Sequence, residues 1–233
     1  MARAGFPVIA VVGRKGTGKT RVVEALTRAL TERGYKVVTA KHVPEEGFSL
    51  DKPGKDTWRH AEAGAAAVLL VAPGEVDTLR RARAGEPNFD DVLALATRER
   101  PDVLILEGFR SMAGIRADVP KIVVVSGLGE AKEVLAEGSV RPVLAFVGPG
   151  EAGELEVPYV SHEELHKLVE LVEETMRAWK RAGDLRARLV VRGKEVPLNR
   201  FVSEVLRKLV LAFISCLKGV DIKGDERVEV LVE

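Results

Sequence analysis

One segment of the chain carries glycines and polar side chains at a spacing typical of a phosphate-binding loop. Residues 13–20 read GRKGTGKT, which fits the pattern G-x-x-x-x-G-K-[ST] at every fixed position. An apolar β-branched run over residues 8–12 precedes the loop, and a helical pattern from Arg21 to Arg33 follows it. A strand, a glycine loop and a helix in this order aim backbone N–H groups and the positive helix end at one spot. The sequence therefore predicts that the chain binds a nucleoside triphosphate or a closely similar molecule.

The residue types in this loop assign it specific chemistry. Lys19 supplies a point charge for the β- and γ-phosphates, and the Thr20 hydroxyl can ligate Mg²⁺. The predicted phosphate-binding residues of the loop are Gly13, Lys15, Gly16, Thr17, Gly18, Lys19, Thr20 and Arg21.

A bound Mg²⁺ also needs a carboxylate at the end of a neighbouring strand. Glu107 ends the apolar run 103–106, and ligands of open α/β sheets bind outside the carboxyl ends of the strands. Asp102 lies at the opposite end of the same strand, so the geometry favours Glu107. Gly108 would let the backbone approach the γ-phosphate.

A second polar cluster follows the predicted second strand, residues 36–41. Lys41 and His42 end this strand, and Asp51 and the segment 54–60 (GKDTWRH) come after them. Two interpretations remain open from the spacing alone: the cluster contacts Mg²⁺ and phosphate, or Asp56 caps a helix in an ordinary polar loop. His42 and His60 are candidate ligands, although lone histidines are more often structural.

Strands and helices alternate along most of the chain. Continuous Val/Ile/Leu runs indicate strands covered on both faces. We therefore predict an α/β P-loop NTPase domain over residues 1–182 with a doubly wound, mostly parallel sheet. The expected strands are 8–12, 36–41, 66–71, 76–81, 102–106, 121–125 and 143–147; the expected helices are 19–33, 56–63, 88–98 and 161–180, the last opened by a capping box at Ser161.

The sequence of residues 183–233 predicts a small α+β accessory domain. A hairpin over 185–191 and 194–196 precedes a helix that Asn199 caps and that runs to about 218, and 228–232 form a last strand. A unit of this size is marginal alone. We expect it to pack on the main domain or on another copy.

Composition excludes some classes of function. The 36 Lys and Arg residues nearly cancel the 35 Asp and Glu residues, and a net charge of +1 argues against general nucleic-acid binding. Cys216 is the one cysteine, which suits a cytoplasmic protein without internal disulfides, and we expect it to be a small core residue. No apolar run is long enough for a membrane span. The absence of Gln, with only two Asn and many charges, favours a thermophilic source.

Together these residues resemble one family, the molybdopterin-guanine dinucleotide biosynthesis protein B, which is the adapter protein of molybdenum-cofactor maturation. The resemblance covers roughly residues 6–180. It rests on the phosphate loop and on Lys41-His42, Asp51, Pro53 to Asp56, Arg59, residues 63–65 and residues 107–109 (EGF). Many enzymes share the phosphate loop, but the combination with Pro-Gly-Lys-Asp and Glu-Gly-Phe is much more specific.

The resemblance implies a Mg²⁺-dependent GTP-binding protein with weak GTPase activity that acts as a dimer. It also implies a partner, the guanylyltransferase that attaches GMP to molybdopterin, and delivery of nucleotide, molybdopterin or its guanine dinucleotide form. Carried to matching positions, the catalytic candidates are Lys19, Glu107 and Asp56. The metal ligands would be Thr20, Glu107 and Asp56, and Lys41, Lys55 and Gly108 would join the nucleotide site.

Two positions depart from the family pattern. Residues 43–46 read VPEE where the family commonly carries further histidines, so the metal or cofactor role of those histidines does not carry over. Arg110 stands where a Lys is usual, which keeps the charge and changes the geometry.

Two other classes of function fit the same phosphate loop. A small-molecule kinase would need an acceptor pocket and a base, and the region 72–89 has no obvious base except Asp77 and Glu86. A binding module would use GTP as a switch or carry a metal. The chain has no Asn-Lys-x-Asp tetrad, and the loops after Val125 and Val147 are mostly Gly and Pro, so GTP is assigned from the resemblance alone. The dimer also rests on the resemblance, helped by an exposed strand edge at 76–81.

Overall fold

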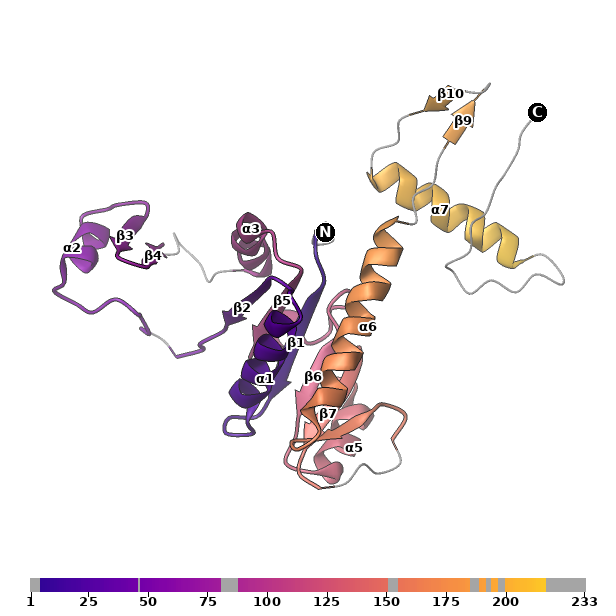
Figure 1. Ribbon diagram of the computed structural model, residues 1–233, viewed down its shortest axis with the longest axis horizontal. Helices are drawn as coiled ribbons and strands as arrows, with labels where there is room; N and C mark the ends of the chain where they lie inside the picture. The colour runs from indigo at the N-terminus through magenta and orange to yellow at the C-terminus, as the bar shows by residue number, and fades with distance from the viewer. Residues whose placement is uncertain are drawn as a thin grey trace. The chain divides into compact units, whose positions relative to one another are not determined.

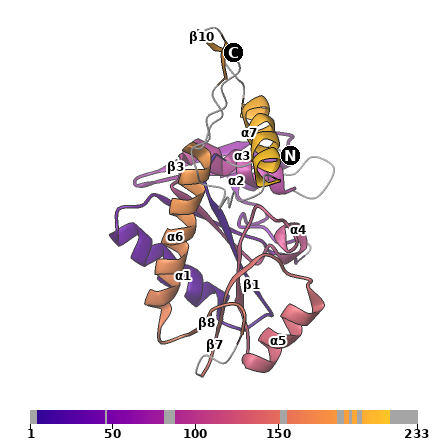
Figure 2. The same ribbon diagram turned by 90° about the vertical axis from the view of Figure 1, so that its right-hand side faces the viewer.

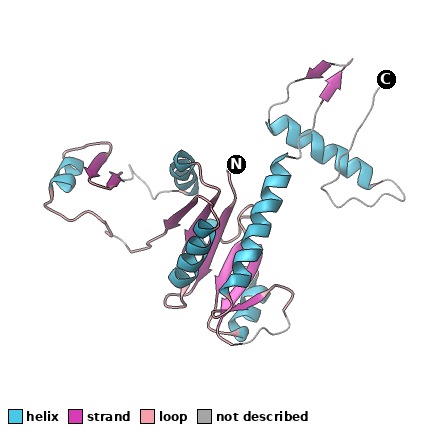
Figure 3. Cartoon of the chain, viewed as in Figure 1, coloured by secondary structure: helices cyan, strands magenta, loops and turns pink. Residues whose placement is uncertain are grey.

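The computed structural model of the protein describes residues 5–45, 47–80, 88–150, 155–184, 189–191, 194–196 and 200–216. Strands and helices alternate over most of this range (Figure 1, Figure 3). The strands are β1 Val8–Gly13, β2 Val37–Lys41, β3 Val68–Ala72, β4 Glu75–Leu79, β5 Val103–Glu107, β6 Lys121–Val124, β7 Val143–Gly148, β8 Tyr159–Ser161, β9 Leu189–Val191 and β10 Lys194–Val196. The helices are α1 Lys19–Glu32, α2 Asp56–Glu62, α3 Phe89–Glu99, α4 Arg110–Ala113, α5 Leu128–Glu137, α6 Leu165–Asp184 and α7 Arg200–Ser215.

A six-stranded sheet with the order β2-β5-β1-β6-β7-β8 forms the centre of the main unit. All of its strand pairs are parallel. Within the sheet, β2 and β5 lie on one side of β1. The later strands β6, β7 and β8 lie on the other side of β1. The predicted doubly wound sheet is therefore confirmed, and its topological switch point lies at the carboxyl end of β1.

Both faces of this sheet are covered, as the uninterrupted apolar strands predict. Val8, Ala10 and Val12 of β1 belong to the core cluster that includes Phe89 and Leu93 of α3. Helix α1 buries Val22, Val23, Leu26 and Leu30. Figure 2 shows α1 on one side of the sheet and α4 and α5 on the other.

We call the residues between β2 and α3 the insertion (residues 42–88). It contains α2 and the antiparallel hairpin of β3 and β4, which is a sheet of its own. The hairpin turns at Pro73-Gly74, as predicted. Residues 46 and 81–87 of the insertion lie outside the described residues.

The predicted beginning of the long helix at Ser161 is wrong. Ser161 is the last residue of β8, a strand that the sequence analysis missed, and α6 begins only at Leu165. The Ser161 hydroxyl accepts a hydrogen bond from the Glu163 amide at 3.2 Å, so it stabilises a turn after the strand. The His162 amide donates to the Gly148 carbonyl, which ties this turn to the end of β7.

The chain divides into two compact units, Met1–Val169 and Glu170–Glu233. This division falls within α6, whereas the boundary predicted from sequence, 182/183, lies close to the end of that helix. In the second unit β9 and β10 pair antiparallel, which confirms the predicted hairpin. The predicted cap Asn199 and the strand over 228–232 lie outside the described residues.

The C-terminal helix α7 presents apolar side chains to solvent. Val202, Val205, Leu209 and Phe213 are 40–71% exposed and recur at helical spacing. Cys216 follows the end of α7 and is exposed, so its predicted place in a core is wrong. Within the described residues no helix combines the length and the apolar composition that a membrane span requires.

Candidate functional site

The phosphate loop connects β1 to α1 at the switch point of the sheet, and its glycines are required by the backbone. A Cβ atom on Gly13 would lie 2.3 Å from the Val124 carbonyl oxygen and 2.9 Å from the Thr17 hydroxyl oxygen. Gly18 has a φ of +94°, a conformation that residues with side chains rarely adopt. Gly18 is also the N-cap of α1 and provides no side-chain cap. The first N–H groups of α1 are therefore left for an anion.

Three donors of the phosphate loop converge on one carbonyl oxygen. The Lys19 ammonium donates to the Arg14 carbonyl at 2.6 Å, and the Thr17 hydroxyl donates to the same oxygen at 3.0 Å. The Thr17 amide lies 3.5 Å from it. Lys19 is thus folded back along its own loop, with its ammonium on the Arg14 carbonyl.

Glu107 joins the phosphate loop to β2. The Thr20 hydroxyl donates to Glu107 Oε1 at 2.8 Å, and the Lys41 ammonium lies 3.2 Å from the same oxygen. Lys41 and Glu107 are partners in the register of β2 and β5, so the sheet itself places them side by side. Glu107 is only 8% exposed. The structure therefore brings together Thr20 and Glu107, and their role as metal ligands stays a prediction.

Asp102, the other carboxylate considered from sequence, directly precedes β5 at the end opposite to Glu107. Asp102 Oδ2 accepts a hydrogen bond from the Lys36 amide at 3.0 Å, which closes the beginning of β2. Asp102 therefore has a structural role.

The residues present fit a Mg²⁺ ion. Mg²⁺ prefers hard oxygen ligands and binds proteins through one or two side chains while it keeps several waters. The Thr20 hydroxyl donates its hydrogen bond to Glu107, which leaves the oxygen lone pairs of Thr20 for another ligand. Within the described residues no group of three or more His, Cys, Asp and Glu side chains is placed to hold a metal ion.

A second carboxylate anchors the phosphate loop from the other side. Glu130 of α5 accepts hydrogen bonds from the Ser126 amide (2.7 Å) and hydroxyl (2.8 Å), and it pairs with the Arg14 guanidinium at 3.1 Å. The Ser126 amide, with smaller contributions from the Ser126 hydroxyl and Arg14, lowers the pKa of Glu130. This cluster fixes Arg14 to the loop after β6. The sequence analysis missed it because it requires the packing of α5, which the motif does not specify.

Comparison with known proteins agrees with the geometry. The family model for Molybdopterin guanine dinucleotide synthesis protein B (MobB) matches residues 8–148, which include the phosphate loop, Lys41 and Glu107. The chain belongs to the MobB family.

Relatives of this MobB-family chain come from bacteria and archaea. The molybdopterin-guanine dinucleotide biosynthesis adapter protein of Escherichia coli (strain K12) is 32% identical over 134 residues, which are 56% of this chain and 72% of that protein. A Methanocaldococcus jannaschii protein, provisionally named as such an adapter, is 25% identical over 96% of this chain and 97% of its own length. Most of the C-terminal residues 183–233 therefore have a counterpart in the archaeal protein.

Solved structures share the fold. The crystal structure of Bacillus subtilis MobB aligns with a TM-score of 0.57 at 23% identity, over 73% of this chain and 98% of that chain. A second MobB crystal structure aligns with a TM-score of 0.56 at 24% identity, over 73% and 99%. These alignments support the P-loop NTPase fold of the MobB-family chain.

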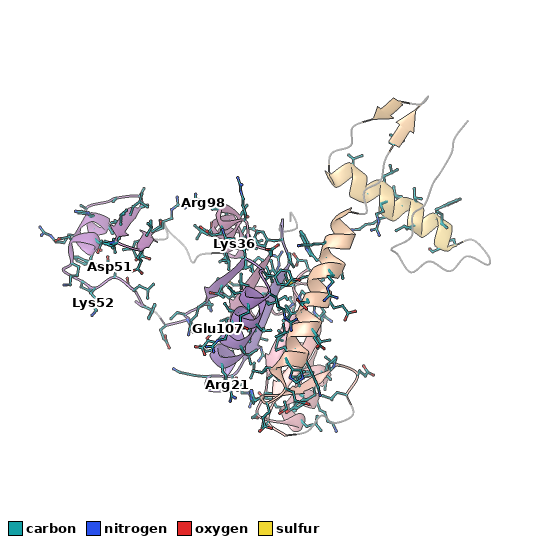
Figure 4. The ribbon with its side chains drawn as sticks, in the orientation of Figure 1. Arg21, Lys36, Asp51, Lys52, Arg98 and Glu107 are labelled. Carbon is teal, nitrogen blue, oxygen red and sulfur yellow. The ribbon has the colours of Figure 1, made fainter. Side chains whose placement is uncertain are left out.

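The remaining predicted residues of the phosphate loop and its surroundings lie around this centre. Lys15 is almost fully exposed, and its ammonium lies 3.6 Å from Glu45 of the insertion. Arg21 is exposed on the first turn of α1 (Figure 4). Gly108 donates its amide to the Val11 carbonyl and has a φ of +84°, so it holds the backbone next to β1.

The insertion carries the other two predicted residues, Lys55 and Asp56. Lys55 is the N-cap of α2 and Asp56 its first residue, so Asp56 is not the cap. The nearby Asp51 accepts a hydrogen bond from the Thr57 hydroxyl at 2.8 Å, which gives it a local structural role. Within the described residues no hydrogen bond or ion pair joins Lys55 or Asp56 to the phosphate loop, and their place in the site stays a prediction.

The histidines considered from sequence lie in different environments. The His42 ring packs against Phe109 with centroids 5.5 Å apart, and the His42 amide donates to the Glu107 carbonyl. His42 therefore supports the strand end, while His60 is exposed on α2. A third histidine, His162, lies next to Gly18 of the phosphate loop. The sequence analysis did not consider His162, because it interpreted the segment at Ser161 as a helix cap.

Proposed function

We propose that this protein is a GTP-binding, Mg²⁺-dependent adapter in the synthesis of molybdopterin guanine dinucleotide, with weak GTPase activity. The observation that carries the proposal is the Glu107 carboxylate, which joins Thr20 of the phosphate loop to Lys41 at the switch point of the sheet. Membership of the MobB family supports the pathway. A cytoplasmic location and a thermophilic source stay predictions from composition.

The residues of the site would have different roles in nucleotide binding and in hydrolysis. Lys19 would leave the Arg14 carbonyl for the phosphates, and Thr20 with Glu107 would hold Mg²⁺. When bound, Mg²⁺ supplies positive charge that neutralises the phosphate oxygens. Glu107 or Asp56 would orient the attacking water, and Lys19 would stabilise the charge on the transferred phosphoryl group.

We propose that the active form is a homodimer built on the β3–β4 hairpin. Helix α2 packs on β3, and Val68 of β3 is buried. The opposite face carries Leu69, Val71 and Val76, which are 68%, 74% and 71% exposed. An isolated two-stranded sheet is marginally stable, and a large exposed apolar face marks an interaction site. A second copy would cover this face and both would gain stability.

Calorimetric titration with GTP and ATP, with and without Mg²⁺, tests the nucleotide proposal. A tenfold preference for GTP corresponds to about 1.4 kcal/mol. We expect this preference in the wild type, loss of binding in Lys19→Ala, and a requirement for Mg²⁺. A preference for ATP would contradict GTP binding and would favour the kinase alternative.

The partner is tested separately, with purified molybdopterin guanylyltransferase and GTP. The wild-type protein should co-elute with the transferase and increase the yield of the guanine dinucleotide, and Lys19→Ala should increase it less. An unchanged yield with the wild type would reject the adapter role.

A further inference from the structure

Arg14 is a cation of the phosphate loop to which the sequence motif assigns no role. It occupies the first variable position of G-x-x-x-x-G-K-[ST], directly after Gly13. Its backbone carbonyl accepts the hydrogen bond of the Lys19 ammonium at 2.6 Å. Lys19 is the residue that would turn to the β- and γ-phosphates of a bound nucleotide. Phosphates bound by Lys19 would therefore lie close to Arg14.

The partner of Arg14 is a carboxylate that Ser126 holds in place. Glu130 is the third residue of α5, and its Oε2 accepts hydrogen bonds from the Ser126 amide at 2.7 Å and from the Ser126 hydroxyl at 2.8 Å. The Glu130 side chain is only 10% exposed. Its pKa is lowered, above all by the Ser126 amide, so the carboxylate is charged at neutral pH. Ser126 thus gives Arg14 a fixed and charged anchor.

The ion pair uses one part of the Arg14 guanidinium. The closest approach is 3.1 Å between Arg14 Nε and Glu130 Oε1, and the Arg14 side chain remains 71% exposed. In the part of the chain that the structure describes, its two terminal amino groups make no hydrogen bond. The guanidinium is planar, so pairing at Nε orients the whole group and leaves the terminal N–H donors accessible. Such parallel donors suit two oxygens of one phosphate.

Two neighbouring cations are held in a different way. Arg110, which also lowers the pKa of Glu130, donates to the hydroxyl of the exposed Ser139 at 3.0 Å. Lys15 lies 3.6 Å from Glu45, a carboxylate that is itself 63% exposed. Neither has an almost buried anchor, whereas Arg14 combines such an anchor with exposed donors.

We propose that Arg14 binds the terminal phosphate of the bound nucleoside triphosphate, and that Glu130 is the positioning residue that presents the Arg14 amino groups to it. A terminal phosphate has three free oxygens, so it can meet two donors of Arg14 together with Lys19 and Mg²⁺. The inference rests on the proposed nucleotide binding and adds a residue that distinguishes a triphosphate from a diphosphate.

Calorimetric titration with Mg²⁺-GTP and Mg²⁺-GDP tests the role of Arg14. Arg14→Gln should lower the affinity for GTP roughly tenfold or more, because charge-assisted hydrogen bonds are lost, and should leave the affinity for GDP unchanged. Arg14→Lys keeps the charge without the planar fork, so it should restore only part of the GTP affinity. Lys132→Gln, which removes an exposed cation of α5, should change neither affinity. Titration with ATP and ADP keeps the test independent of the base.

The same assay tests Glu130. Glu130→Gln keeps an acceptor for Ser126 and removes the charge that pairs with Arg14. We expect the GTP affinity to fall roughly threefold, because Arg14 keeps its charge and loses its fixed orientation. In the Arg14→Gln background the substitution should have no further effect, as expected of a residue that acts through Arg14. Glu133→Gln, an exposed glutamate of α5, is the matched control and should change nothing.

The ratio of GTP to GDP affinity decides the outcome. An equal loss of both affinities in Arg14→Gln would mean that this side chain only supports the loop, and an unchanged GTP affinity would mean that it does not contact the terminal phosphate. Additive losses in the double variant would mean that Glu130 stabilises α5 without acting through Arg14. A wild type that binds none of the four nucleotides would instead reject the proposed nucleotide binding.

Discussion

The phosphate-binding edge and the insertion between β2 and α3 are built in opposite ways. At the phosphate-binding edge Glu107 is almost buried, and it is tied to the loop and to β2 by Thr20 and Lys41. In the insertion Val71 and Val76 are more than two-thirds exposed, and its hairpin shares no strand with the main sheet. The Thr20, Glu107 and Lys41 contacts of the first region are made within one chain, while the second presents surface that a single chain leaves uncovered. Nucleotide binding should therefore be a property of the monomer, and the insertion should act through association.

The largest effect should come from charges placed on the exposed face of the hairpin. Val71 and Val76 are cross-strand partners, so Val71→Asp combined with Val76→Asp puts two like charges at the centre of the proposed interface. We expect the dimer dissociation constant to rise roughly 100-fold or more, because buried unpaired charges are costly. Sedimentation velocity measures it, and GTP affinity should stay within about threefold, a change of under 1 kcal/mol.

A matched control for this variant is Ile115→Asp. Ile115 is 70% exposed in the main unit, so the substitution adds a charge at similar exposure away from the hairpin. It should leave the oligomeric state unchanged. Equal dissociation by both variants would contradict an interface on the hairpin, and a monomeric wild type would reject the proposed dimer.

The next effect concerns the carboxylate at the phosphate-binding edge. Glu107→Gln keeps an acceptor for Thr20 and removes the negative charge that a metal ion needs. We expect Mg²⁺-dependent GTP affinity to fall roughly tenfold to 100-fold, which corresponds to about 1.4 to 2.7 kcal/mol. GTP affinity without Mg²⁺ should not fall. Calorimetry at several Mg²⁺ concentrations measures both.

Asp102→Asn is the control for Glu107→Gln, because it neutralises the carboxylate at the other end of the same strand. It should weaken the contact with the Lys36 amide and lower the melting temperature slightly, with unchanged Mg²⁺ dependence. If both variants lose Mg²⁺ dependence equally, the loss reflects general destabilisation rather than the site.

A smaller effect would connect the two regions. The Asp56 carboxylate is at the start of α2, and we predict that it reaches the nucleotide only in the assembled protein. Asp56→Asn should reduce the GTP hydrolysis rate roughly tenfold, which is less than the roughly 100-fold or more that a general base contributes, and should leave GTP affinity unchanged. Asp51→Asn is the comparison: it weakens the bond with Thr57 and should lower stability. Unchanged hydrolysis in Asp56→Asn would remove Asp56 from the site.

The contrast between the regions also explains what the sequence could predict. The phosphate loop, Glu107 and Lys41 follow local rules, because parallel strands bring their carboxyl ends to one edge. His162 escaped prediction because Ser-x-x-Glu fits a helix cap as well as the turn that follows β8. Glu130 escaped because its partners Ser126 and Arg14 meet only through the packing of α5.

The sequence pattern also did not predict a buried lysine at the opposite end of the sheet, at the start of β6. Residues 121–125 indicate a buried strand, and that prediction is confirmed, but its first residue, Lys121, is completely buried. Its ammonium donates to the carbonyls of Arg116 and Arg141. A lysine has a long apolar stem, so an apolar pattern does not show where its charge is placed.

The smallest predicted effect follows from this lysine and concerns stability alone. Burial lowers the pKa of Lys121 to about 8 from its usual 10.5, against the smaller opposing effect of Asp118. Between these two pH values the unfolded chain holds a proton that the folded chain has lost, so the free energy of unfolding should increase with pH. Urea denaturation between pH 8 and 9.5 measures this slope below the titration of Tyr159, whose pKa is raised by burial. The slope should be smaller in Lys121→Met, which removes the charge and keeps the stem, and unchanged in Lys132→Met, which replaces an exposed lysine of α5. Equal slopes in the wild type and in Lys121→Met would mean that the two carbonyl hydrogen bonds offset burial and that the pKa of Lys121 is not lowered.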